Sequence, residues 1–317
     1  MKISLSATVL LLLLSRLAWP FPPYEQVKSA YERSDAYLLD RRGEIIHEKR
    51  VLKAGRRLNW SPLNVISPAM RHATVFAEDR RFYSHSGVDW MAVSGSLLRG
   101  IGSGKPRGAS SITMQVVSFL DSQLRASGTR RSMAQKISQA RQALTLEKSW
   151  TKDQILEAYL NLASFRGEIE GIDAASQWHF GKAPQGLNSV ESVVLACLLR
   201  APGASSAMVA DRAGRLAEEM SLSLSDAEIQ ESVQKALSGK HFIKPASDDA
   251  PFVAKTLLSE ISEPKVQSTL DGEIQRFAAE TLSEQILSIH SQNVQDGAVL
   301  VVCNRTGEVL AYVGNTG

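Results

Sequence analysis

The sequence predicts a mainly α-helical domain, with a short β section before it and an incomplete α+β unit after it. Over residues 67–220, apolar residues recur at spacings of three and four, which is the period of an amphipathic helix. Residues 35–60 place apolar stretches on either side of Arg42 and Gly43, a pattern typical of a β-hairpin. From Val266 onward, one helical segment precedes two apolar strands joined by a short turn.

Length and composition exclude several classes of protein. A chain of 317 residues has room for about two domains. With 44% hydrophobic and 22% charged residues, it is neither disordered nor a multi-span membrane protein. The net charge of +3 is too small to indicate nucleic acid, and we expect no nucleic-acid partner. Cys197 and Cys303 lie in separate apolar runs, which favours buried free thiols over a disulfide or zinc.

The N-terminus is typical of an export segment. Lys2 precedes a nearly uncharged, leucine-rich run over residues 3–14. A cleaved signal and an uncleaved anchor both fit, and we favour an anchor over residues 1–24 because no small-x-small cleavage site follows the run. Either way, the body of the chain is expected outside the cytoplasm. Three aromatic residues are expected at the lipid headgroups: Trp19, Phe21 and Tyr24.

These patterns divide the chain into five segments. They are the anchor, a short β section, the helical domain, a linker that carries one amphipathic helix, and a final α+β unit: residues 1–24, 25–59, 60–220, 221–265 and 266–317. Two strands and one helix cannot enclose a core of their own. The final unit is therefore expected to be the start of a larger domain.

Two segments rich in Gly, Ser and basic residues interrupt the helical domain, at 99–110 and 120–131. Both are typical of loops. They are able to present positive charge to a phosphate, but for a basic loop in isolation we favour a solvated connection.

The densest cluster of chemically active side chains is the stretch AEDRRFYSHSGVDW. A carboxylate beside arginines and aromatic rings suits a general acid or base, because burial raises its pKa while cations lower it. A salt-bridged helix end is the alternative. The charged and titratable members fall within twelve positions: Glu78, Asp79, Arg80, Arg81, His85 and Asp89.

A second cluster, RGASSITMQ, places Ser110, Ser111 and Thr113 before Gln115 where a loop enters a helix. Free amides and hydroxyls at such a helix start bind anions, although Ser110 or Ser111 as a simple N-cap explains the pattern equally. In a third stretch, the spacing predicts that Lys136, Gln139 and Glu147 lie on one face of a helix. An ordinary solvated helix face is the alternative there.

Together and in this order, these clusters resemble the peptidoglycan glycosyltransferases, glycosyltransferase family 51. EDRRFYSHSG is similar to the family's EDxxFxxHxG, GASSITMQ to GxSTITxQ, and ESVVLACLLRAP to EAAxLAxLxxAP. ILEAYLN and the GIDAASQWHFGK that follows match a further section, so the resemblance covers about residues 60–220. WPFPP and the segments STLDGEIQ and NRTGEVLAYVG are similar to the penicillin-binding protein 1C subgroup, here ending early in its transpeptidase domain.

The resemblance implies a lysozyme-like fold and polymerisation of lipid II into glycan strands with release of undecaprenyl pyrophosphate. It implies Glu78 as the catalytic base. It implies no firm cofactor and leaves open a divalent cation, Mg²⁺ or Mn²⁺. The implied substrate-binding residues are Asp79, Arg81, Phe82, His85, Gly87, Gly108, Ser110, Ser111, Thr113, Gln115, Lys136 and Gln139.

The implied partners are lipid II, the growing glycan chain, the inner membrane and other cell-wall synthesis proteins. The implied location is the inner membrane, with one anchor and the catalytic domain in the periplasm. A hydrophobic approach to the bilayer is expected near Leu97, Leu98 and Ile101.

The sequence departs from the family pattern in its third motif. Where the family has RKxxE, this chain has Gln135, Lys136 and Gln139, and an amide cannot supply the charge of the missing glutamate. A weak or inactive lipid II-binding remnant is therefore the alternative function. Arg166 replaces a family glycine and either adds a cation to the cleft or caps a helix.

Two further functions are weighed against polymerisation. Transpeptidase activity is expected to be absent, because SWTK at Ser149 and SEPK at Ser262 match the SxxK motif by letters only. A lytic glycosidase on the same general fold would need a carboxylic acid that protonates a glycosidic oxygen, and nothing in the sequence indicates a substrate without phosphate.

Overall fold

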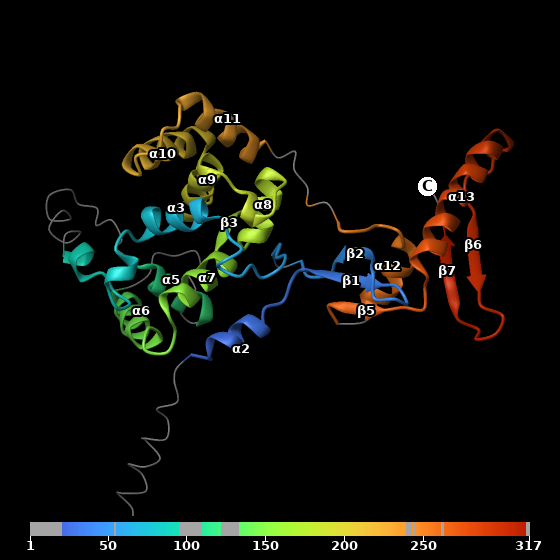
Figure 1. The fold of residues 1–317 in the computed structure, drawn as a ribbon, viewed down its shortest axis with the longest axis horizontal. Coiled ribbons are helices and arrows are strands. Elements are labelled where there is room, and N and C mark those ends of the chain that lie inside the picture. The colour runs from blue at the N-terminus through green and yellow to red at the C-terminus, as the bar shows by residue number, and fades with distance from the viewer. Residues whose placement is uncertain are drawn as a thin grey trace, which may run out of the picture. The chain divides into compact units, whose positions relative to one another are not determined.

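The computed structural model describes residues 21–53, 55–94, 110–121, 133–238, 243, 245–260 and 263–314. The chain divides into two compact units (Figure 1). The first comprises Met1–Tyr31 and Trp60–His241, and the second comprises Glu32–Asn59 and Phe242–Gly317. The segment predicted as a separate β section thus belongs mostly to the C-terminal unit.

Helices make up most of the first unit, which confirms the mainly α class predicted for it. They are α2 (Tyr24–Ser29), α3 (Pro68–Glu78), α5 (Ile112–Leu120), α6 (Met133–Leu146), α7 (Lys152–Leu162), α8 (Ile172–Phe180), α9 (Ser189–Arg200), α10 (Ser206–Glu219) and α11 (Asp226–Leu237). Short elements complete it: strands β3 (Ser164–Arg166) and β4 (Ile169–Glu170), and the 3₁₀ turns η1 (Phe82–Ser84) and η3 (Pro184–Gly186).

Helix α9 lies at the centre of the first unit. Every residue from Glu191 to Leu199 is buried, and the helix packs against α3, α10 and α11. Asn188 and Glu191 form a capping box at its start, which satisfies amide groups that would otherwise be unpaired in the interior. The apolar run of the sequence therefore becomes the core helix that supports α3 and α10.

Helix α11 extends the first unit beyond the predicted boundary at residue 220. Ile229, Val233 and Ala236 recur at spacings of four and three and are buried. They place one face of the helix against α8, α9 and α10. The amphipathic helix predicted in the linker is confirmed, but it packs into the helical unit instead of linking two domains.

The aromatic residues near the N-terminus do not lie where the sequence predicted. Phe21 and Tyr24 are buried, each 7% exposed, so the expectation of a place at the lipid headgroups was wrong for both. The Tyr24 hydroxyl donates to the carboxylate of Glu157, to which Trp60 Nε1 also donates at 2.6 Å. Trp19 lies outside the described residues. Among the helices that are described, none combines the length and hydropathy needed to cross a bilayer.

The second unit is built on a three-stranded sheet of order β2-β1-β5. Strand β1 (Asp35–Leu39) pairs antiparallel with β2 (Ile45–Arg50), confirming the predicted hairpin. It also pairs in parallel with β5 (Lys265–Gln267), with Tyr37 opposite Lys265. This long-range pairing explains why the early β segment folds with the C-terminal part of the chain.

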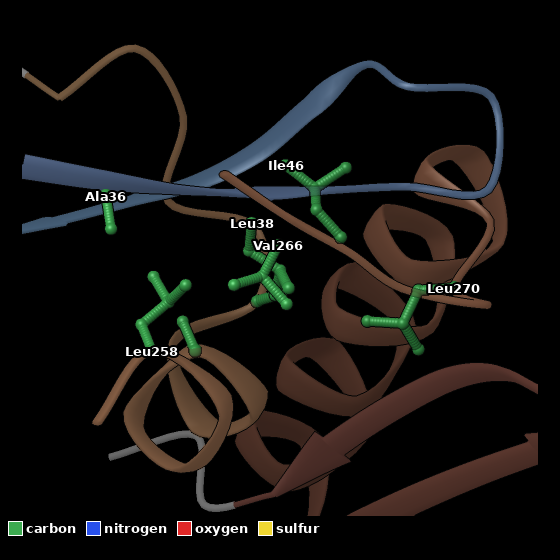
Figure 2. Packing of buried hydrophobic residues seen from close by; sticks show 8 residues of the cluster. Ala36, Leu38, Ile46, Leu258, Val266 and Leu270 are labelled. Carbon is green, nitrogen blue, oxygen red and sulfur yellow. The ribbon is translucent and has the colours of Figure 1, made fainter. Parts of the chain in front are cut away.

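Figure 2 shows the apolar core of this unit, in which side chains from the sheet fill the space above the helices. Leu38 and Ile46 are at most 2% exposed, as is Leu258 of α12 (Pro251–Glu260). Helix α12 falls within the predicted linker, so that segment contributes to a core instead of spanning solvent.

The last part of the second unit follows the sequence prediction closely. Helix α13 (Gly272–Ile289) precedes the short turn η4 (His290–Gln292) and the hairpin of β6 (Ala298–Val302) and β7 (Val309–Gly314). Gln275 joins helix and hairpin, because its side chain donates to the Tyr312 carbonyl at 3.2 Å and accepts from the Tyr312 amide at 2.8 Å. The assignment of this region as the start of a transpeptidase domain stays a prediction.

Candidate active site

A cavity of about 850 Å³ opens beside the end of α3. Its walls come from the last residues of α3 and the segment after it, from Ser110 and Ser111, and from α9 and α10, which pack together (Figure 1). The charged residues lining it are Glu78, Asp79, Arg80, Arg81, Asp89, Arg200, Arg212, Arg215 and Glu219.

Glu78, the predicted catalytic base, is the last residue of α3 and lines this cavity. Its Oε2 accepts a 2.8 Å hydrogen bond from Gln115 Nε2. Its Oε1 is buried and has no hydrogen-bond partner among the described residues. Burial raises the pKa of this carboxyl group, an effect opposed by the Gln115 hydrogen bond and the charge of Arg200. One carboxylate oxygen is thus held in place and the other is able to receive a proton.

Asp79 has a different role from its neighbour. Both of its carboxylate oxygens lie 3.0 Å from His85 Nε2, and one also accepts from the backbone amide of Ile112 at 3.1 Å. It therefore ties the end of α3 to the start of α5, and His85 is held by the same carboxylate. The structure brings these two predicted residues together as supports of the site.

Arg81 lies on the cavity wall, whereas its neighbour Phe82 lies in the core. The Arg81 guanidinium forms a two-pronged ion pair with Asp89, at 3.0 and 2.5 Å, on the cavity wall. Phe82 is fully buried, and the Lys152 ammonium lies 4.4 Å from its ring centre. Since no part of Phe82 reaches the surface, its placement corrects the expectation of direct substrate contact.

Gly87 allows a close approach between two segments. Its φ is +86°, and an added Cβ would lie 2.7 Å from the backbone carbonyl of Ala143 in α6. No side chain fits at that distance. The glycine therefore positions the first motif against α6, a packing role in place of the predicted substrate contact.

The second cluster forms the start of α5, as the sequence predicted. Ser111 is the N-cap, since its hydroxyl accepts from the Met114 amide, and it also donates to the Gly87 carbonyl. The predicted role of N-cap is thus confirmed for Ser111. Ser110 lines the cavity, while Thr113 is fully buried and donates to Glu147. Gly108 lies outside the described residues.

The third stretch does not reach the cavity through its predicted binding residues. Lys136 is half-buried on α6 and is not among the residues that line the cavity. Gln139 is 1% exposed, and its amide donates to the Met114 carbonyl at 3.2 Å. The three residues expected on one helix face therefore have different surroundings: Lys136 is half-buried, Gln139 is buried, and Glu147 accepts a hydrogen bond from Lys152 at 2.7 Å. Gln139 packs α6 on α5.

The contacts of Arg166 answer the question that the sequence left open about its role. Arg166 Nη1 donates to the carbonyls of Pro202 and Ala204, at 3.1 and 2.9 Å, so it holds the turn between α9 and α10. The structure also brings to the site residues that the sequence did not single out, among them Tyr159, Arg200 and Arg212. The Tyr159 hydroxyl donates to Gln115 Oε1 at 3.4 Å. Arg200 and Arg212 lie in ordinary amphipathic helices, so the sequence does not mark them as site residues. The packing of α9 on α10 brings them to the cavity.

The prediction of a buried free thiol is confirmed for Cys197, but the predicted burial is wrong for Cys303. Cys197 is buried and Cys303 is partly exposed, and neither forms a disulfide. Cys197 lines the cavity, and burial raises its pKa to about 12. Its thiol is therefore protonated at neutral pH and is not a nucleophile there.

The comparison with protein families matches residues 42–227 to the model described as Transglycosylase. The chain belongs to this family. The transglycosylase match spans the whole of α3 to α10, and with them every residue that lines the cavity.

The chain is also similar to several curated proteins. The chain is 29% identical to penicillin-binding protein 2D of Bacillus subtilis over 82% of this chain and 40% of that protein. It is 35% identical to the biosynthetic peptidoglycan transglycosylase of Pseudomonas entomophila over 51% of this chain and 69% of that protein. It is 32% identical to penicillin-binding protein 1C of Escherichia coli over 67% of this chain and 27% of that protein. The chain thus spans less than half the length of the two penicillin-binding proteins.

Among the residues that the structure describes, no group of three or more His, Cys, Asp or Glu side chains is arranged to hold a metal ion. At the position of the glutamate in the family's third motif, Gln139 donates its amide to the backbone carbonyl of Met114 at 3.2 Å.

Proposed function

We propose that the chain is a peptidoglycan glycosyltransferase, which polymerises lipid II into glycan strands with Glu78 as the general base. One observation carries this proposal. Glu78 lines the cavity with one oxygen fixed by Gln115 and the other buried without a partner among the described residues. A base needs this arrangement, because its geometry has to be fixed while one oxygen stays able to accept a proton.

The reaction is a displacement at the anomeric carbon. The 4-hydroxyl of the acceptor sugar attacks that carbon, and the bond to the diphosphate oxygen breaks with inversion. The hydroxyl proton passes to Glu78, and the bonding electrons leave with undecaprenyl pyrophosphate. Glu78 has to be ionised for this step, so activity requires a pH above its raised pKa.

A lipid II-binding remnant is the second candidate function. Gln139 favours it, because this buried amide occupies the position of a family glutamate and carries no negative charge. Its contact with the Met114 carbonyl favours the active enzyme instead, since the amide has a packing role that does not require a charge. A turnover assay separates these two candidates.

We also propose a place at the inner membrane, with the catalytic unit on the periplasmic side. The leucine-rich run over residues 3–14 supports this proposal. Its partners there would be lipid II, the growing glycan chain and other cell-wall synthesis proteins. Fractionation of cells expressing the full chain tests it: recovery in the cytosolic fraction contradicts the proposal.

The decisive experiment incubates the full chain with labelled lipid II in detergent and resolves the products by length. Glu78→Gln and a moenomycin-treated sample run beside it. We expect polymer from the unmodified chain, and a loss of about 10²- to 10⁴-fold in Glu78→Gln, the range that a general base contributes. Bound lipid II without polymer supports the remnant, and cleavage of finished glycan without lipid supports the lytic glycosidase.

A further inference from the structure

The α9–α10 wall of the cavity carries three arginines to which the sequence motifs assign no role: Arg200 lies within ESVVLACLLRAP, and Arg212 and Arg215 lie outside the motifs. Arg200 ends α9, and Arg212 and Arg215 lie on α10. All three line the cavity. Their charges all act on the thiol of Cys197, as does that of Glu78, so the four groups converge on one region.

Arg215 already has a partner. Its Nη2 lies 2.6 Å from the carboxylate of Asp211, one turn earlier on α10, and both side chains are more than 60% exposed. This ion pair is local to the helix surface and is screened by water. Arg215 thus matches Arg212 in charge and helix but differs in its surroundings.

Arg212 differs in having an unsatisfied donor. Its Nη1 is buried and has no hydrogen-bond partner among the described residues. A guanidinium donor that is removed from water and left unpaired is costly, and an oxyanion satisfies such a donor well because the geometry allows two parallel hydrogen bonds. Arg212 is therefore poised for an acceptor that the described residues do not supply.

Arg200 is held beside the predicted base. Its Nη1 donates to the carbonyl of Ala77, the residue before Glu78, at 2.9 Å. A guanidinium carries five donors in a planar fork, so this one bond leaves others to face the cavity. Arg200 and Arg212 together supply two positive charges on the α9–α10 side of Glu78.

We propose that Arg200 and Arg212 form an oxyanion subsite, which takes a phosphate or a carboxylate group of the substrate on the α9–α10 side of Glu78. The inference deepens the proposed function and rests on it for the identity of the substrate. It does not involve Lys136, a substrate-binding residue implied by the family resemblance, which lies on α6 and is not among the residues that line the cavity. Lipid II carries both chemistries, a diphosphate and the carboxylates of its peptide stem.

The test measures binding to the full chain by calorimetry at constant ionic strength. The two probes are inorganic pyrophosphate and the dipeptide acetyl-alanyl-glutamate. Arg212→Gln is compared with Arg215→Gln, which removes the same charge three positions later on the same helix. Arg212→Lys keeps the charge without the fork, and Lys136→Gln reports on the α6 side. Circular dichroism checks that each variant is folded.

We expect Arg212→Gln to weaken the binding of at least one probe by about tenfold or more, the effect of losing a hydrogen bond between charged groups. We expect Arg215→Gln to change it by less than about twofold, as for an exposed pair. The probe whose binding is weakened shows whether the subsite takes the phosphate or the carboxylate group of the substrate. Equal losses in the two variants, a loss confined to Lys136→Gln, or no binding of either probe would overturn the subsite.

Polymerisation of lipid II is measured on the same preparations, so that the two proposals fail separately. If the protein binds the probe through Arg212 but makes no polymer, the proposed glycosyltransferase activity is contradicted and the proposed subsite is supported. Chain that polymerises lipid II with probe binding unaffected by Arg212→Gln contradicts the subsite alone.

Discussion

The side-chain amide of Gln115 donates a 2.8 Å hydrogen bond to the carboxylate of Glu78 and thereby joins α5 to the last residue of α3. The orientation of that amide is itself set, because Tyr159 in α7 donates its hydroxyl hydrogen to Gln115 Oε1 at 3.4 Å. Three helices thus determine where the predicted base points. The position of one carboxylate oxygen depends on packing across the whole helical unit.

Replacing Gln115 by Ala tests this relationship. The hydrogen bond lowers the pKa of Glu78 against the stronger effect of burial, so its loss leaves that pKa higher still. We expect turnover to fall by about tenfold and the acidic limb of the pH–rate profile to move to higher pH. Tyr159→Phe, which leaves the Gln115–Glu78 bond in place, is the control and should show a smaller shift. An unchanged acidic limb in Gln115→Ala would contradict the role given to the amide.

Replacing Glu78 by Gln is expected to stabilise the fold while it lowers turnover. Burial raises the pKa of Glu78 above its ordinary value of 4.5, so the folded chain holds this proton more tightly than the unfolded chain. The contribution of Glu78 to stability is therefore complete below pH 4.5 and is lost as the pH rises through the raised pKa. Urea unfolding at pH 4 and pH 8 measures the effect, and the stability gain of the variant should appear at pH 8. A variant less stable than the parent at pH 8 would count against this account.

Replacing Gly87 by Ala should disturb the contact between the first motif and α6. The new Cβ would lie 2.7 Å from the Ala143 carbonyl, at a φ of +86°. We expect the free energy of unfolding to fall by about 2–4 kcal/mol, from overpacking combined with backbone strain. Gly167→Ala is the matched control, since Gly167 has a φ of +56° and nothing within 4 Å of an added Cβ. That variant should lose only about 1 kcal/mol, and similar losses in the two variants would show that packing against α6 is not responsible.

Restoring the family glutamate at position 139 should cost stability. Gln139→Glu replaces a buried donor with an acceptor and removes the side-chain hydrogen bond to the Met114 carbonyl. We expect the free energy of unfolding to fall by about 1–3 kcal/mol at pH 8. The loss should be smaller at pH 4, where the new carboxyl group is protonated and able to donate. Gln142→Glu on the same helix is the control, because the Gln142 amide contacts Asp121 and Ser138 side chains and no backbone carbonyl. A fully stable Gln139→Glu variant with higher turnover would favour the interpretation that the missing carboxylate limits this enzyme.

The elements of the fold followed from local patterns. The buried run of α9, the helix of α11 and the hairpin at Gly43 are each recorded in the spacing of apolar residues or in a turn glycine. The ordered motifs likewise identified Glu78 and Gln115, because short-range patterns preserve the residues that a reaction needs. Helix α12 was not predicted, because its ten residues follow a polar stretch and are too few to show a clear helical period.

Tertiary structure decided which of those residues face the cavity. Phe82 and Gly87 belong to a motif that predicts binding, yet one fills the core and the other packs on α6. Arg200 and Arg212 come from two helices whose sequences give no sign that they meet. The pairing of β1 with β5 joins segments more than 200 residues apart. A sequence determines the residue types and the local period, but contacts between distant segments depend on how helices and strands pack, and no local pattern encodes that packing.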